Sequence, residues 1–265
     1  MSQAELEVCV DNSAALFSCL RSGVDRVELC SALAVGGLTP SYGLMKLAGR
    51  LAESAAVSGV GGIRGDDKRS VGRPPRTQVL AMIRPRSGNF CFSTMETTLM
   101  CEDIAVAREA GLAGVVLGAA TAEGTLDLPI LARLCHAAEG LQLTLHRVID
   151  VLDDPLLAID QAVELGFTRI LTSGGAPTVA DGLSRLSAIQ MHAGRRIQIM
   201  AGAGLTPTLA KRIQAEIGIE SFHASCRRQA TADPVLSAFG FSGEEGELDV
   251  ALIDDYRRSL ASVDY

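Results

Sequence analysis

The sequence predicts a (β/α)₈ barrel, in which eight parallel strands close into a ring and helices cover the outside. Short β-rich runs alternate with longer segments whose apolar residues follow helical spacing. Four segments, RSGVDRVELC, REAGLAGVVLG, VELGFTRILTS and AEIGIESFHAS, share one pattern, a helix that ends at glycine before the next strand. Eight such units with short connections favour one α/β TIM-barrel domain over residues 1–265. An open doubly wound sheet is the alternative, disfavoured because no G-x-G-x-x-G follows the first strand.

The expected elements follow one another along the chain. Strands are expected at residues 6–11, 26–30, 79–86, 114–121, 143–150, 169–175, 197–204 and 221–227. Helices are expected at residues 13–22, 95–109, 129–138, 155–165, 182–192 and 207–217. Asp154 before Pro155 and Thr206 before Pro207 each place a capping residue ahead of a proline at the first helical position.

Two segments depart from this repeat. Residues 55–78 are rich in Gly, Arg, Asp and Pro without apolar periodicity, which predicts a mobile insertion on the barrel face opposite the usual active site. A loop without any chemistry is the plainer interpretation. The chain after Phe239 begins with an acidic loop, and we expect a C-terminal helical tail at residues 248–262.

Composition narrows the class of protein. The chain of 265 residues is 48% hydrophobic and 21% charged, as in globular proteins with an ample core. No apolar run is long enough for a membrane span, and no secretory signal is recognisable. A net charge of −7 argues against a general nucleic-acid surface. The seven cysteines form no C-x-x-C pair, which favours reduced thiols in the cytoplasm over disulfides or structural zinc.

Alternation along the expected strands puts an unusual set of polar side chains on the inner face of the barrel. The set is Glu7, Cys9, Asp11, Glu28, Cys30, Arg84, Thr144, His146, Thr172, His223 and Ser225, and the third strand also points Arg86 that way. A barrel that serves only as a scaffold fills these positions with Val, Ile and Leu. The polar interior therefore predicts a functional site.

Each group also has a plainer interpretation. A glutamate with Arg84 can be a structural ion pair, and His146 or His223 a hydrogen-bonded core histidine. Cys9 and Cys30 on adjacent strands are either two buried thiols or ligands of one metal ion.

Two glycine-rich turns give a further signal. The turns are Ser173, Gly174 and Gly175 after the sixth strand, and Gly202 and Gly204 after the seventh. Small residues late in such a barrel let backbone N–H groups approach an anion, often a phosphate. Tight-turn geometry alone is the alternative.

Six segments in the same order resemble the CutC family of copper homeostasis proteins: EVCVD at 7–11, DRVELCSALAVGGLTPSYG at 25–43, MIRPRSGNF at 82–90, LTLHRVID at 143–150, LTSGG at 171–175 and FHASCR at 222–227. The resemblance covers almost the whole chain. It implies a TIM barrel, a cytoplasmic location (also nuclear in eukaryotes), a homo-oligomer that is a dimer or tetramer, and copper(I) bound through Cys9 and Cys30. The insertion at 55–78 departs from the family pattern.

Three functions remain open at this point. The first is a Cu(I)-binding protein, with Cys9 and Cys30 as ligands. The second is an enzyme for a small anionic, for example phosphorylated, metabolite. In it Glu28 or Asp11 serves as base and His146 as acid, while the anion is held by Arg84, Arg86 and the turns at 173–175, 202 and 204. The third is a scaffold or interaction protein without turnover. We expect no nucleic-acid or membrane partner.

Overall fold

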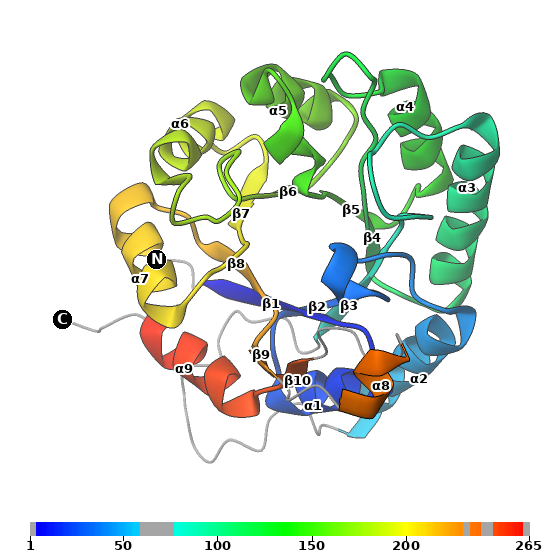
Figure 1. Ribbon diagram of the computed structural model, residues 1–265, viewed down its shortest axis with the longest axis vertical. Coiled ribbons are helices and arrows are strands. Elements are labelled where there is room, and N and C mark those ends of the chain that lie inside the picture. Colours follow the sequence, from blue (N-terminus) through cyan, green and yellow to red (C-terminus); the bar gives the residue numbers. More distant parts are fainter. Residues whose placement is uncertain (1–3, 59–76, 230–233, 240–245, 262–265) are drawn as a thin grey trace.

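A closed barrel of eight parallel strands in chain order forms the centre of the computed structural model, which describes residues 4–58, 77–229, 234–239 and 246–261 (Figure 1). The strands are β1 (Glu5–Val10), β2 (Arg26–Leu29), β3 (Gln78–Met82), β4 (Gly114–Leu117), β5 (Gln142–Leu145), β6 (Arg169–Thr172), β7 (Gln198–Ala201) and β8 (Ser221–Ala224). The ring closes because β8 pairs with β1, with Glu7 opposite His223. The predicted TIM barrel is confirmed.

Helices surround the strands (Figure 1). They are α1 (Ser13–Ser22), α2 (Tyr42–Ser58), α3 (Thr94–Glu109), α4 (Leu128–Ala137), α5 (Pro155–Glu164), α6 (Leu183–Ala193) and α7 (Pro207–Ile217). The predicted caps form: the Asp154 side chain accepts from the N–H groups of Leu156 and Leu157, and Thr206 accepts from Leu209. These contacts satisfy N–H groups that have no partner within the helix.

All eight strands end earlier than alternation suggests, by one to five residues, and the difference is largest in β5. The strand expected over residues 143–150 ends at Leu145, and a 3₁₀ helix, η2 (Arg147–Val151), follows. His146 causes this change of direction, because its Nδ1 accepts a hydrogen bond from the Val148 N–H at 3.1 Å. The expectation of strand up to residue 150 was therefore wrong.

The chain departs from the barrel repeat at three further places. A 3₁₀ helix, η1 (Leu33–Val35), follows β2. Of the insertion expected at 55–78, residues 55–58 end α2, Gln78 begins β3, and residues 59–76 lie outside the described residues. After β8 come β9 (Arg227–Gln229), α8 (Pro234–Ala238), β10 (Gly246–Leu248) and α9 (Val250–Leu260). Helix α9 packs against α7 and α1 and buries Ile253, Tyr256 and Leu260.

The barrel interior is filled with side chains near the amino ends of the strands and is open near their carboxyl ends. Near the strand starts, Arg26 donates to Glu5 at 2.7 Å, to Glu7 at 3.0 Å and to Ser221 at 2.7 Å. Arg169 in the same part donates to the side chains of Gln142, Thr144 and Gln198. This polar layer fills the barrel near the amino ends of the strands, so space for a ligand is left at their carboxyl ends. Within the described residues, no helix is long and apolar enough to cross a membrane.

Candidate functional site

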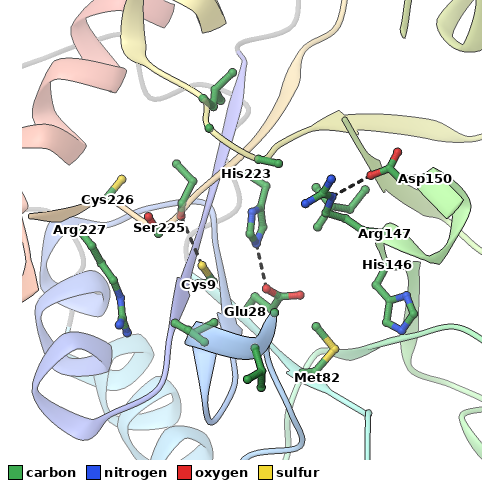
Figure 2. A pocket seen from close by; sticks show the side chains of 18 of the residues that line it. Cys9, Glu28, Met82, His146, Arg147, Asp150, His223, Ser225, Cys226 and Arg227 are labelled. Atoms are coloured by element: carbon green, nitrogen blue, oxygen red, sulfur yellow. Dashed lines mark hydrogen bonds and ion pairs between the residues drawn. The ribbon is translucent and has the colours of Figure 1, made fainter. Parts of the chain in front are cut away.

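A cavity of about 540 Å³ lies at the carboxyl ends of the strands (Figure 2). Its polar lining includes Cys9, Glu28, Arg84, His146 and His223, and its apolar lining includes Leu33, Val35, Met82, Leu171 and Leu205. These side chains come from distant parts of the sequence and meet because the barrel is closed. Ligand sites in this fold occupy the same end of the barrel.

Cys9, Glu28 and His223 form a cluster at the wall made by β8, β1 and β2. Figure 2 shows His223 and Glu28 facing each other, with Cys9 beside them. Nε2 of His223 lies 2.9 Å from Oε2 of Glu28. One ligand atom from each of the three residues lies within 4.8 Å of the other two, a spacing at which they can hold one metal ion.

The cluster is buried and electrostatically coupled. Burial disfavours the charged imidazole of His223, but Cys9 and Glu28 outweigh burial and raise the pKa of His223 well above its ordinary value. Oε2 of Glu28 contacts the imidazole, whereas its buried Oε1 has no hydrogen-bond partner among the described residues. The cluster therefore offers a sulfur, an imidazole and an unused carboxylate oxygen.

Cys30 lies outside this cluster, although Cys9 and Cys30 are the sequence-predicted metal pair. Its side chain is fully buried and packs against Leu80, Met82 and Val116. It does not line the cavity. Burial, together with the nearby Glu28, raises the pKa of the Cys30 thiol well above its ordinary value.

Arg84 lies across the cavity and is held by two loops. Its guanidinium donates to the carbonyl oxygens of Val35 at 2.8 Å, Gly37 at 3.2 Å and Gly88 at 2.9 Å. The same group stacks over the ring of Phe90, 4.9 Å from its centre. The buried Nε has no partner. Among the described residues, no acidic side chain lies within 4.0 Å of this guanidinium.

His146 lies beside Phe90, with the two ring centres 4.9 Å apart. Because its Nδ1 accepts from the Val148 N–H, the neutral ring carries its proton on Nε2, and this buried atom has no partner. Burial, with a smaller contribution from Arg84, lowers the pKa of His146 to about 3. His146 is thus a neutral hydrogen-bond donor.

Two other predicted site residues lie away from the cavity. Arg86 donates to Glu96 at 2.5 Å and to the carbonyl oxygens of Asn89 and Cys91, so it fastens the loop that precedes α3. Asp11 forms an ion pair with Arg227 beyond the end of β1. Neither Arg86 nor Asp11 lines the cavity.

The glycine turn after β6 binds a carboxylate of the chain itself. Asp150 accepts from the N–H groups of Ser173 at 3.1 Å and Gly175 at 3.0 Å, and the Gly174 N–H donates to Thr172. The Arg147 side chain completes the arrangement by donating to Asp150 at 2.7 Å. An external anion at residues 173–175 would first have to displace Asp150.

The turn after β7 shapes the cavity. A Cβ on Gly202 would lie 2.7 Å from Cδ1 of Leu171, so a larger residue there would displace this cavity-lining side chain, and Gly204 lines the cavity with φ +66°. Leu171 faces the cavity, whereas Thr172 does not line it and donates to Asp150 at 2.5 Å. The expected inward orientation of Thr172 was therefore wrong by one residue.

Sequence reasoning missed part of the lining. Arg147 and Asp150 follow the point where η2 replaces the expected strand, so alternation could not place them. Leu252 and Tyr256 of α9 also line the cavity, and the Tyr256 hydroxyl donates to the Leu205 carbonyl at 2.5 Å. Amphipathic spacing indicated a packed helix there but gave no sign that the helix reaches the site.

Comparisons with known proteins agree on one family. The model of the CutC family matches residues 4–228. A CutC family protein of Rhizobium meliloti (strain 1021) is 43% identical over 265 residues, which cover 98% of this chain and 97% of the relative. One from Caulobacter vibrioides (strain NA1000 / CB15N) is 44% identical over 239 residues, covering 89% and 88%.

Two solved structures resemble this chain, one of them from the same family. A CutC crystal structure from Streptococcus agalactiae, named for copper homeostasis, is 34% identical with a TM-score of 0.73, and the match covers 84% of this chain and 98% of that one. Thiamine phosphate pyrophosphorylase from Pyrococcus furiosus has a TM-score of 0.57 at 12% identity, covering 97% and 95%. At that identity the likeness is one of fold alone.

Proposed function

This chain belongs to the CutC family, and from that premise we propose that it serves copper homeostasis by binding Cu(I) at Cys9 and His223. The observation that supports the proposal is the grouping of Cys9, Glu28 and His223, whose ligand atoms lie within 4.8 Å of one another. Copper is the cargo of such a protein, so the site has to take up the ion and release it again.

The donor atoms suit the ion. Thiolate sulfur and imidazole nitrogen are ligands that Cu(I) accepts, and a carboxylate is a harder group that this ion does not need. Copper would replace the proton on the ligating nitrogen of His223, so binding would release a proton. The alternative pair of Cys9 and Cys30 requires the Cys30 thiol to ionise while fully buried beside Glu28. We therefore favour His223 over Cys30 as the second ligand.

A titration of Cu(I) against a competing chelator tests this assignment under anaerobic conditions. We expect C9S and H223Q to weaken binding at least tenfold, because each removes one of two ligands. C30S should bind as the unchanged protein does, and C135S on α4 is the matched control for loss of a thiol. Unchanged affinity in C9S would exclude this site, and weakening in C30S but not in H223Q would favour the pair of cysteines.

The family also supports proposals on location and assembly. We propose a cytoplasmic protein that forms dimers or tetramers, with neither nucleic acid nor membrane as a partner. Light scattering of the purified full chain measures the assembly directly, and a monomer at micromolar concentration would contradict it.

A second candidate function is an enzyme that acts on a small anionic metabolite by proton transfer. The observation that favours it is the unpartnered Oε1 of Glu28, on a carboxylate whose other oxygen is held by His223 at 2.9 Å. A carboxylate oriented in this way is suited to act as a general base. In this proposal the neutral His146 donates a hydrogen bond to the substrate and does not act as the acid.

Metabolite profiling tests the second candidate. The full chain is incubated with the anionic small-molecule fraction of a cell extract, and the mixture is followed by mass spectrometry. We expect the unchanged protein to consume a component that E28Q leaves untouched, because the amide keeps the shape of Glu28 but cannot accept a proton. Equal profiles for the two proteins would argue against turnover.

A further inference from the structure

Arg84 is a buried cation that faces the cavity, and no anionic side chain in the described part of the chain pairs with it. We propose that the cavity binds the carboxylate group of a small organic monoanion between Arg84 and His146. This carboxylate site does not depend on copper binding. It rests on the second candidate function only for the expectation that the bound ligand is converted. A small organic monoanion is then the substrate class that this candidate left open.

The Arg84 guanidinium has more N–H donors than its contacts with the described residues use. It carries five N–H groups, and three of them go to the carbonyl oxygens of Val35, Gly37 and Gly88. Two N–H groups remain available to a ligand, the Nε–H and one N–H on Nη2. Neighbouring N–H groups of this kind form the fork that binds the two oxygens of a carboxylate.

The other buried or half-buried guanidinium groups of the barrel have their charge compensated. Arg26 pairs with Glu5 and Glu7, Arg147 with Asp150, and Arg227 with Asp11. Arg169 lies in the layer of Glu5 and Glu7, whose charges act on it. Arg84 is only 6% exposed and has no such partner among the described residues. An unpaired buried charge is costly, so the site is built to receive an anion.

His146 supplies a second donor to the same space. The side chain is 3% exposed, and its Nε2–H has no partner while Nδ1 is fixed by the Val148 N–H. Phe90 packs against both groups: the Arg84 guanidinium lies over its ring, 4.9 Å from the centre, and the His146 ring centre is 4.9 Å away with the ring planes tilted by 48°. Because the imidazole is neutral, the pair carries a single positive charge.

That single charge favours a carboxylate over a phosphate. A monoanion is balanced by Arg84 alone, whereas a phosphate dianion would leave one charge uncompensated in a buried site. The backbone N–H groups of Ser173 and Gly175, which a phosphate would use, are taken by Asp150. Apolar Leu33, Val35 and Leu171 line the rest of this space, which suits a short carbon chain.

The probes are sodium lactate and sodium acetate. Each is titrated into the full chain, and sodium chloride keeps the ionic strength constant. The chain has four histidines, so the Nε2–H of His146 can be followed by NMR and identified with H146Q. We expect a saturable shift of this resonance with both carboxylates and a smaller response to inorganic phosphate. Calorimetry should show affinity at least tenfold weaker in R84K, which keeps the charge but loses the fork, and unchanged in R212K on the outer helix α7.

Three results would overturn the inference: no saturable response to either carboxylate, tighter binding of phosphate, or equal affinity in R84K. The NMR titration uses the unchanged protein, so it decides even if R84K fails to fold. E28Q separates this inference from the second candidate function, because it should bind lactate while lacking turnover. Absence of turnover in the unchanged protein, with lactate bound, would remove the enzyme proposal and leave the carboxylate site standing.

Discussion

Buried polar atoms without partners are concentrated on the inner face of the barrel. Four such atoms are buried with no hydrogen bond to any residue that the structure describes: Oε1 of Glu7, Oε1 of Glu28, Nε of Arg84 and Nε2 of His146. Leaving such an atom unsatisfied costs about 1–3 kcal/mol of stability. Three of the four residues, Glu28, Arg84 and His146, line the cavity, so a ligand that pairs with them would recover part of this free energy.

His146 should make the protein sensitive to acid. The pKa of its imidazole is 6.5 ordinarily and about 3 when folded, mainly because of burial. Between these two pH values the unfolded chain binds more protons, so the free energy of unfolding decreases as pH falls from 6.5 to 3. We expect H146Q to remove this contribution, on the order of 5 kcal/mol over the window. Urea unfolding at several pH values measures it.

The exposed His136 provides the control for this experiment. H136Q should keep the pH dependence of the unchanged protein. If H146Q and the unchanged protein lose stability in parallel below pH 6.5, His146 is not the group responsible.

Asp150 should matter for stability as an internal anion. Its carboxylate accepts from the Ser173 and Gly175 N–H groups and from Arg147. We expect D150N to lower the free energy of unfolding by about 2–4 kcal/mol, because hydrogen bonds to a charged acceptor are the stronger ones. Urea denaturation measures the change, and D153N on the exposed neighbour is the control. A loss equal to that of D153N would contradict the role of Asp150.

At the scale of the element, a glycine after β4 makes room for the histidine after β5. A Cβ on Gly118 would lie 2.6 Å from Cε1 of His146 and 2.7 Å from Cγ1 of Val148. We expect G118A to destabilise the protein by about 1–3 kcal/mol through overpacking, and to displace the imidazole. Thermal unfolding and the NMR signal of His146 report the two effects.

Gly43 in α2 is the matched control, because nothing lies within 4 Å of a Cβ placed there. G43A should be neutral or stabilising by up to about 1 kcal/mol, since alanine favours a helix. Equal changes in thermal stability for G118A and G43A would contradict the close fit between Gly118 and His146.

Alternation predicted the inner face on β1, β2 and β8, but within β6 it pointed Thr172 inward where Leu171 lines the cavity. It placed Cys9, Glu28 and His223 toward the cavity, because side chains in a pleated strand alternate strictly. It failed past the strand ends, where Arg86 turns to Glu96 and Asp11 to Arg227. Backbone hydrogen bonds no longer impose the period of two there, so local loop contacts decide the direction.

The candidate cluster depends on the closure of the whole barrel. His223 and Glu28 are 195 residues apart in the sequence, and their contact requires β8 to pair with β1 beside β2. Repeated helix ends and strand spacing predicted the barrel. Which side chains pair inside it depends on the stagger between strands, which no local pattern in the sequence expresses. The Asp150 contact with the turn at 173–175 was missed because η2 replaces the expected strand there.

Arg26 should hold the closed ring together, because it joins Glu5 and Glu7 of β1 to Ser221 of β8 from its place on β2. We expect R26M to lower the free energy of unfolding by about 3–5 kcal/mol, since Glu7 is fully buried and would lose its counterion. The double variant R26M/E7Q should recover part of this loss, because the fully buried carboxylate that lost its counterion is replaced by a neutral amide. R212M, which breaks an exposed ion pair with Glu216, should have a much smaller effect, because solvent screens such a pair. Urea unfolding compares the four proteins, and a loss in R26M as small as that in R212M would show that the ring closes without this layer.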